Sequence, residues 1–460
     1  MVPAPTIQCI RCTNDVLVSE SYRYAQSEKP VCSPCYYRRV IESFRTGLAI
    51  SRQYYMNTIK KINDTQNDNP HSITSLPRTD HMLFCYQHTN SCAVMLDALN
   101  QSIYHESIVK KRLSMTYDII LIDMTCIDVI NDSNELIDTV TSINKYNESK
   151  QNTHDYIDYT VQLYTVYIQD IFIIGTDQPI CIHEYTGEPH QTYNTPHTHQ
   201  FNKLYNLITD KSSRADLLQY CTVQLINQFV SQQSTTTKYN YVLLSDNGNS
   251  ISSQLMIATA KGRGYALSYT VQPADIYTVN VHNTRHIDVV YIKPMRDILD
   301  KNVGTYKSIL SNDRTKLVNG TNNTNINDKL TNNNKINSTN ISQLTTDFIS
   351  LLTNRNESSA WNIIRTVEKL ALPYTYKQLQ SSAIPSCTLC TRPYSIQQKQ
   401  HTQQINNQPV KQHVQLYPRS NMCYACSYIF QQISDDSMPS YLLTSTTSNN
   451  TATVSNVTDT

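Results

Sequence analysis

The sequence predicts an α/β protein in which a parallel sheet stands between two small cysteine-rich lobes. Apolar runs of strand length alternate with helical patterns through the middle of the chain, the pattern of a parallel sheet covered on both faces. Eight of the 13 cysteines form C-x-x-C pairs, two pairs near each end of the chain. The 460 residues suffice for one large domain or two to three smaller units.

The composition limits which kinds of ligand and partner the protein is expected to bind. Lys and Arg number 38 against 37 Asp and Glu, a net charge of +1 that argues against a general polyanion binder but leaves room for a local basic face. Only 8 glycines are present, little material for a glycine-rich phosphate loop. The chain shows no membrane-length apolar stretch and no signal peptide at its start, so we expect a soluble, cytoplasmic protein without a membrane role.

The paired cysteines predict two structural zinc sites. The first set, spaced C-x2-C-x19-C-x2-C, comprises Cys9, Cys12, Cys32 and Cys35. The second, spaced C-x2-C-x32-C-x2-C, comprises Cys387, Cys390, Cys423 and Cys426. Random placement would give fewer than one such pair, and four thiolates fill the tetrahedral shell of Zn²⁺, leaving no open position for substrate. Disulfides or a redox C-x-x-C are the alternatives; an intracellular chain disfavours the former.

A basic helix follows the first lobe. Residues Tyr36–Ile59 have helical spacing and carry Arg38, Arg39, Arg45 and Arg52. This face could contact nucleic acid, although a solvated helix face is the commoner explanation. Residues 63–80 are polar and contain proline, which predicts a linker.

The core elements follow in order. The expected strands are His81–Cys85, Tyr117–Met124, Tyr167–Gly175, Tyr241–Ser245 and Ile287–Ile292. The expected helices are Cys92–Tyr104, Ala215–Val230 and Ile251–Ala260, and after the core Leu344–Leu352 and Trp361–Leu370.

The predicted organisation has seven parts. They are the zinc lobe and helix start (1–45), the helix end and linker (46–80), the α/β core (81–300), an Asn/Thr-rich insertion (301–343), a helical segment (344–380), the second zinc lobe (381–435) and a disordered tail (436–460).

The five remaining cysteines, Cys85, Cys92, Cys126, Cys181 and Cys221, are expected to be small apolar core residues. Only Cys85, at the end of the first core strand, stands where chemistry would be expected.

Several blocks together resemble the cytoplasmic tRNA 2-thiolation protein 2 family. Their order over more than 400 residues carries the resemblance, not any single block. The blocks are Cys9–Cys12, Cys32–Cys35, Phe44–Arg45, Ser213–Leu218, Lys261–Gly264, Lys293–Asp297 with Tyr306, Leu344–Ile349, Ile364–Leu370, Cys387–Cys390 and Cys423–Cys426.

The resemblance implies a fold, a role and partners. The fold is an ATP-pyrophosphatase-like (adenine nucleotide alpha hydrolase-like) core between zinc lobes. The role is that of a subunit in a heterodimer that 2-thiolates the wobble uridine of certain tRNAs, forming 5-methoxycarbonylmethyl-2-thiouridine. The implied partners are a catalytic thiolase subunit, tRNA and a thiocarboxylated ubiquitin-related modifier that supplies sulfur.

Two loops depart from active relatives of that fold. Their S-G-G-x-D-S loop, which admits pyrophosphate to a helix N-terminus, corresponds here to Cys85–Ser91, with neither glycine. Their G-H-N-x-D-D loop corresponds to Ser245–Ser250. We therefore expect no ATP activation by this chain, and a non-catalytic subunit.

Two alternatives stay open: a thiouridylase in its own right, using Cys85 or Cys221, and a zinc-stapled scaffold without an RNA role. The candidate tRNA contacts are Arg38, Arg39, Arg45, Lys261 and Arg263. For Arg296 and Asp297 we favour local pairing where a strand ends over phosphate contact.

Overall fold

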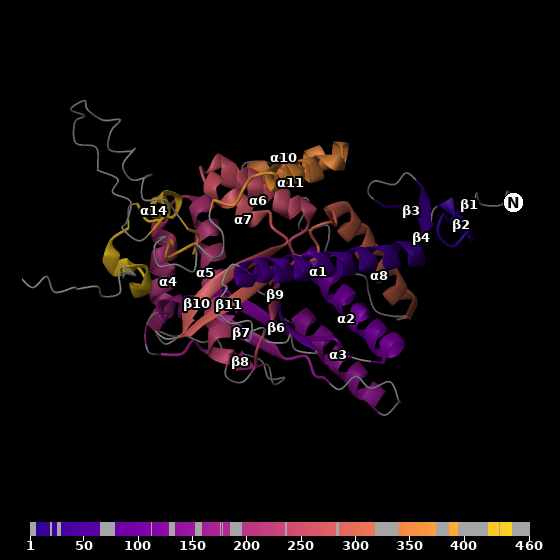
Figure 1. Cartoon of the computed structure of the whole chain (residues 1–460), viewed down its shortest axis with the longest axis horizontal. Coiled ribbons are helices and arrows are strands. Elements are labelled where there is room, and N and C mark those ends of the chain that lie inside the picture. Colours follow the sequence, from indigo (N-terminus) through magenta and orange to yellow (C-terminus); the bar gives the residue numbers. More distant parts are fainter. Residues whose placement is uncertain are drawn as a thin grey trace, which may run out of the picture.

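The computed structural model describes residues 6–18, 21–24, 29–64, 79–111, 113–127, 134–151, 159–174, 176, 178–184, 196–234, 237–281, 285–317, 340–373, 386–393, 422–431 and 433–443. At its centre is a seven-stranded sheet in the order β10-β11-β9-β5-β6-β7-β8 (Figure 1). The strands are β5 (Asp80–Tyr86), β6 (Met115–Asp123), β7 (Leu163–Tyr167), β8 (Ile182–Glu184), β9 (Tyr241–Leu243), β10 (Ala274–Val281) and β11 (Arg285–Ile292).

The five strands from β11 to β7 are parallel, whereas the edge strands β10 and β8 are antiparallel to their neighbours. The mostly parallel α/β class predicted from the sequence is confirmed.

Side-chain alternation divides the sheet into two buried faces. Met82 and Phe84 of β5 belong to one core, and Leu83 and Cys85 to the other. The helices α1 (Ser33–Asp64), α2 (Asn90–Lys110), α3 (Asn134–Gln151) and α8 (Asp300–Leu317) contribute to the first core. The helices α4 (Pro196–Leu207) and α5 (Lys211–Gln233), together with the C-terminal cysteines, contribute to the second.

A further group of helices packs together beside the sheet. It comprises α6 (Gly248–Ala260), α7 (Leu267–Thr270), α10 (Ile341–Arg355) and α11 (Ser358–Glu368). Ile251 and Leu255 of α6 and Ile364 of α11 are buried between them. Because α6 follows β9 directly, this group is tied to the carboxyl edge of the sheet.

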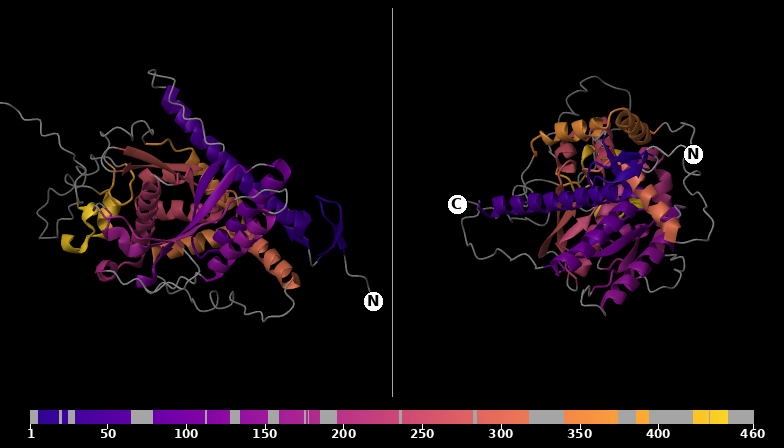
Figure 2. Two further views of the ribbon diagram at one scale, coloured as in Figure 1. Left: turned by 90° about the horizontal axis from the view of Figure 1, so that it is seen from below. Right: turned by 90° about the vertical axis from the view of Figure 1, so that its right-hand side faces the viewer.

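The two cysteine lobes are small. At the N-terminal end β1 (Thr6–Gln8) pairs with β2 (Asp15–Leu17), and β3 (Ser21–Arg23) with β4 (Pro30–Cys32), both antiparallel. The C-terminal lobe contains α14 (Tyr424–Ile429) and the 3₁₀ turns η6 (Asp435–Ser437) and η7 (Ser440–Leu442). The lobes lie at opposite ends of the long axis of the molecule (Figures 1 and 2).

Three of the predicted segments are corrected by the structure. The strand predicted at Tyr167–Gly175 is wrong: β7 ends at Tyr167, and a buried 3₁₀ turn, η4 (Ile168–Phe172), follows. Helix α8 occupies the start of the predicted insertion, because Val303, Tyr306 and Ile309 give it a buried face. The predicted tail begins with ordered turns in which Met438 and Leu442 are buried.

Three predicted segments lie wholly or mostly outside the described residues: most of the linker (63–80), residues 318–339 and residues 444–460. The other predicted boundaries between the seven parts stay predictions. Over the helices that the structure describes, none has the length and apolarity to cross a membrane.

Candidate metal centres and the carboxyl edge of the sheet

The N-terminal cysteines gather at the junction between the lobe and α1. The sulfurs of Cys9, Cys12, Cys32 and Cys35 all lie within 4.8 Å of one another. Cys9 and Cys35 are buried, whereas Cys12 and Cys32 are half-buried. The backbone N–H of Cys32 donates to Cys9 Sγ (3.4 Å). Beside this group, Arg11 pairs with Glu42 of α1 at 2.7 Å on the surface.

The C-terminal cysteines gather inside the second core. The sulfurs of Cys387, Cys390, Cys423 and Cys426 also lie within 4.8 Å of one another, and all four residues are buried. They share this core with α4, α5 and one face of the sheet. The Gln224 side chain of α5 donates to the carbonyls of Thr388 and Leu389, between the first two cysteines (3.1 and 3.0 Å).

Sulfur spacing fits zinc. A tetrahedron with Zn–S bonds of about 2.3 Å has edges of about 3.8 Å. Cys12 Sγ and Cys32 Sγ are 3.7 Å apart, and Cys390 Sγ and Cys423 Sγ are 3.9 Å apart. A disulfide requires about 2.05 Å, and all eight of these cysteines are free thiols here. The two four-cysteine groups therefore fit two structural zinc sites, as predicted.

At the carboxyl edge of the sheet, a strand leads through a short turn into a helix, an arrangement that binds phosphate in other proteins when the turn is rich in glycine. β5 ends at Tyr86, and α2 begins shortly after it at Asn90. The N-cap residue is Thr89, whose hydroxyl accepts from the Cys92 backbone N–H (3.2 Å). No glycine lies in this turn, and the side chains of Tyr86 and His88 contact each other edge to face (5.4 Å between ring centroids).

The second loop closes against the first. Asn247, the N-cap of α6, accepts from the Ser250 backbone N–H at 2.9 Å. Its amide nitrogen donates to Ser91 Oγ of α2 (2.9 Å) and to Asp300 Oδ1 of α8 (2.6 Å). Asp246 accepts from the Ser250 hydroxyl at 2.6 Å. Three helix N-termini thus meet at this edge.

A cavity of about 360 Å³ lies between these helix ends. It is lined by Gln87, Thr89, Asn90, Ser91, Ser245, Asp246, Asn247, Ser250, Asp300, Val303 and Gly304. The described lining contains two carboxylates and neither lysine nor arginine; a nearby cation, Lys307, donates to the lining residue Asn90 at 2.7 Å. Helix N-termini favour an anion, but two carboxylates oppose a polyphosphate.

The candidate tRNA contacts on α1 differ in their surroundings. Arg38 is exposed. The Arg39 guanidinium lies 4.3 Å from the centroid of the Tyr24 ring. Arg45 donates to Ser102 Oγ and to the Gln101 carbonyl of α2 (3.1 and 3.2 Å). Their role in tRNA contact stays a prediction.

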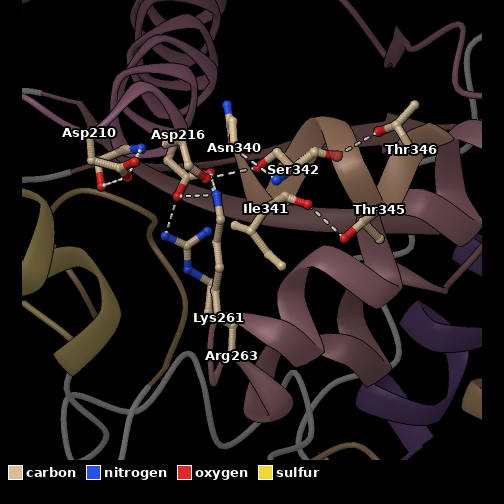
Figure 3. A network of polar contacts seen from close by, with 11 residues as sticks. Asp210, Asp216, Lys261, Arg263, Asn340, Ile341, Ser342, Thr345 and Thr346 are labelled. Atoms are coloured by element: carbon tan, nitrogen blue, oxygen red, sulfur yellow. Dashed lines mark hydrogen bonds and ion pairs between the residues drawn. The ribbon is translucent and has the colours of Figure 1, made fainter. Parts of the chain in front are cut away.

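The other two candidates, Lys261 and Arg263, are held by one carboxylate within the protein (Figure 3). Lys261 Nζ lies 2.8 Å from each carboxylate oxygen of Asp216, and Arg263 Nη2 lies 2.7 Å from Oδ2. Arg263 is only 7% exposed. Because Arg263 is buried and paired with Asp216, this geometry favours a structural role over contact with a tRNA phosphate.

Arg296 is buried and forms an ion pair with Glu368 of α11. The partner of Arg296 therefore lies on a different element and is not the neighbouring Asp297. Local pairing of Arg296 with Asp297 is therefore not what this structure shows, although Arg296 is held within the protein as the structural interpretation requires.

The core cysteines divide into two groups. Cys85, Cys92 and Cys221 are buried as predicted, whereas Cys126 and Cys181 are half-buried. Burial raises the pKa of the Cys85 and Cys221 thiols, which disfavours the thiolate needed for sulfur transfer.

Sequence reasoning missed Asp300 and Tyr265 at these sites. Asp300 approaches the cavity because α8 begins at the carboxyl edge, and no sequence pattern placed a helix there. Tyr265, directly after the Lys261–Gly264 block, donates to Cys423 Sγ at 2.8 Å. Adjacency to that block was the available signal.

No family model and no curated protein matches the sequence. Among solved structures, the chain is similar to the U34-tRNA thiolase NcsA from Methanococcus maripaludis with its 4Fe-4S cluster. Identity is 13%, the TM-score is 0.42, and the match covers 80% of this chain and 87% of that chain.

Proposed function

We propose that this chain is the non-catalytic subunit of a cytoplasmic heterodimer that 2-thiolates the wobble uridine of tRNA. A catalytic partner activates the uridine with ATP, and a thiocarboxylated ubiquitin-related modifier supplies sulfur. This chain stabilises the partner and helps to position tRNA. The ordered sequence blocks, from the first cysteine pair to the last, support the proposal.

One observation carries the non-catalytic role: the composition of the carboxyl-edge cavity. In open parallel sheets, ligands bind outside the carboxyl ends of the strands. Here that place carries Asp246 and Asp300, and its first turn has no glycine through which backbone N–H groups could approach a phosphate. The site is therefore poorly suited to ATP.

The same geometry disfavours independent thiolation. A sulfur-carrying cysteine must reach solvent and ionise, but Cys85 is 3% exposed and Cys221 2% exposed. The α/β core thus offers neither a suitable phosphate site at this edge nor, at these two positions, an accessible thiolate.

Reconstitution tests the proposal. Each purified subunit alone, and the two together, are incubated with tRNA, ATP and a sulfur donor. Mass spectrometry of the digested tRNA then measures 2-thiouridine. We expect thiolation only when both subunits are present. Turnover by this chain alone would establish the independent enzyme, and full turnover by the partner alone would exclude a required subunit.

A matched variant addresses the cavity. Asp246→Asn keeps its side-chain oxygen as an acceptor for Ser250 but removes one negative charge. We expect thiolation by the heterodimer to remain unchanged, because the reaction does not take place in this cavity. Loss of turnover with normal assembly of the two subunits would place chemistry in this chain.

A further inference from the structure

The Lys261–Tyr265 turn joins the core to the C-terminal four-cysteine group. It follows α6, and Gly262 has φ +70°, a left-handed conformation that favours glycine at a helix C-terminus. The residues after Gly262 are thereby directed toward α5 and the cysteine lobe. Arg263 reaches Asp216 of α5, and Tyr265 reaches Cys423.

A zinc ion bound by four thiolates carries a net charge of −2, and here that charge is buried. Cys387, Cys423 and Cys426 are at most 1% exposed, and Cys390 is 6% exposed. Burying uncompensated charge is costly unless hydrogen bonds or opposite charges accompany it. The lobe therefore needs donors or cations from the surrounding protein.

The turn supplies both. The Tyr265 hydroxyl donates to Cys423 Sγ at 2.8 Å. Arg263 is buried and precedes Tyr265 by two residues in the same turn. Its Nε is buried without a hydrogen-bond partner among the described residues. The guanidinium lies 5.5 Å from the centroid of the Tyr220 ring.

Asp216 fixes the position of this cation. It accepts from Arg263 Nη2 at 2.7 Å and also from Lys261 Nζ. Lys261 Nζ also donates to the Ser212 carbonyl (3.5 Å), and Ser212 Oγ lies 2.8 Å from Ser342 Oγ of α10 (Figure 3). Arg263 is thus held in place by a carboxylate of α5.

The N-terminal group is placed differently. Cys12 and Cys32 are half-buried, and the nearby Arg11 is 38% exposed at its side chain and pairs with Glu42. Because this site is partly exposed, water can stabilise its charge and a chelator can reach the metal.

We propose that the Lys261–Tyr265 turn is the support of the C-terminal zinc centre, with Tyr265 as hydrogen-bond donor to Cys423 and Arg263 as buried countercharge. This support makes the C-terminal centre the slower of the two to release zinc. The turn acts on the metal through its ligands, so Tyr265 and Arg263 are positioning residues.

The test uses the full chain loaded with zinc and challenged with the chelator 4-(2-pyridylazo)resorcinol. Iodoacetamide is added in timed pulses, and mass spectrometry measures alkylation at each cysteine, which separates the two centres. The variant Tyr265→Phe removes only the hydroxyl. The control Tyr291→Phe removes a hydroxyl in the same core that donates to Asn227 Oδ1 (2.8 Å) rather than to a cysteine ligand.

In the unmodified chain the N-terminal cysteines should be alkylated first. In Tyr265→Phe we expect the C-terminal cysteines to be alkylated about tenfold faster or more, the usual scale for losing a partner of a metal ligand, with the N-terminal rates unchanged. Unchanged C-terminal rates, or equal acceleration in Tyr291→Phe, would overturn the proposal.

Cobalt substitution gives a second readout. A hydrogen bond to a thiolate stabilises its lone pairs, so its loss in Tyr265→Phe should move the sulfur-to-cobalt charge-transfer band to longer wavelength. An identical spectrum in Tyr265→Phe and the unmodified chain would contradict a hydrogen bond from Tyr265 to the metal-bound sulfur.

Discussion

At the scale of single residues, the close approach of another backbone segment explains why a glycine lies in the middle of α1. Gly47 lies in α1, where alanine is normally the better helix former by about 1 kcal/mol. A Cβ atom at this position would lie 2.2 Å from the Pro294 carbonyl oxygen, in the Lys293–Asp297 segment. The contact of α1 with this segment therefore requires glycine.

We expect Gly47→Ala to destabilise the protein by about 1–3 kcal/mol, the range for overpacking, because backbone cannot move aside as a flexible side chain can. Urea unfolding measures the change. Gly304→Ala in α8 is the matched control, since none of the described atoms lies within 4 Å of its Cβ position, and it should be neutral or stabilising. Equal effects of the two substitutions would refute the steric argument.

A second residue-scale prediction concerns pH. Burial raises the pKa of Asp170 to about 6; Oδ2 accepts from the Cys181 backbone N–H, but Oδ1 has no partner within the described part of the chain. The folded state therefore holds this proton more tightly than the unfolded state. Protonated Asp170 therefore contributes at most roughly 3 kcal/mol to the free energy of unfolding. This contribution is complete below about pH 4 and is lost as the pH rises through 6.

Asp170→Asn should remove this dependence between pH 4 and 6 and raise stability at pH 7, because the amide keeps an acceptor for Cys181 without a buried charge. Urea unfolding at a series of pH values measures it. Asp138→Asn, at an exposed position of α3, should leave the profile unchanged. A profile of Asp170→Asn parallel to that of the unmodified chain would show that Asp170 is not responsible.

At the scale of elements, α1 serves both core packing and the proposed RNA contact. Its Tyr36, Val40 and Phe44 are buried in the first core, while Arg38 is on the opposite, exposed side. In the assembled complex, Arg38→Ala should weaken tRNA binding and reduce the slope of log affinity against log salt by about 1.

The matched control is Arg355→Ala on the exposed end of α10. It should alter neither affinity nor slope. If Arg38→Ala leaves both unchanged as well, α1 does not contact a tRNA phosphate through this residue.

The two cysteine lobes should differ in their effect on stability. The C-terminal cysteines all belong to the same core as α5 and one face of the sheet, whereas Cys12 of the N-terminal set is half-buried and packs against the other core. We expect Cys390→Ser to lower the free energy of unfolding by more than about 3 kcal/mol, and Cys12→Ser by clearly less. Chemical denaturation of both variants at saturating zinc measures this; equal losses would contradict it.

The sequence predicted those elements whose signals are local. The C-x-x-C pairs and the apolar run of β6 are contained in a few adjacent residues, and both were confirmed. The run from Tyr167 failed because a continuous apolar stretch does not distinguish a strand from a buried turn. The role of Arg263 could not be predicted from the sequence, because its ion-pair partner Asp216 lies far away in the chain. Without that partner, basic residues in a turn indicate contact with a phosphate.

At the scale of the whole molecule, a mostly parallel sheet presents carboxylates and amides at its carboxyl edge. The zinc lobes lie at the two ends of the long axis. This arrangement is consistent with the proposed subunit, which would provide a folded surface to a partner and leave the chemistry to it.

Affinity purification of the tagged chain from its own cells tests this account most directly, with bound proteins identified and bound tRNA quantified. We predict recovery of a partner that has an intact S-G-G-x-D-S loop, together with tRNA. Recovery of the chain alone, without that partner and without tRNA, would contradict the proposed heterodimer and favour the scaffold or the independent enzyme.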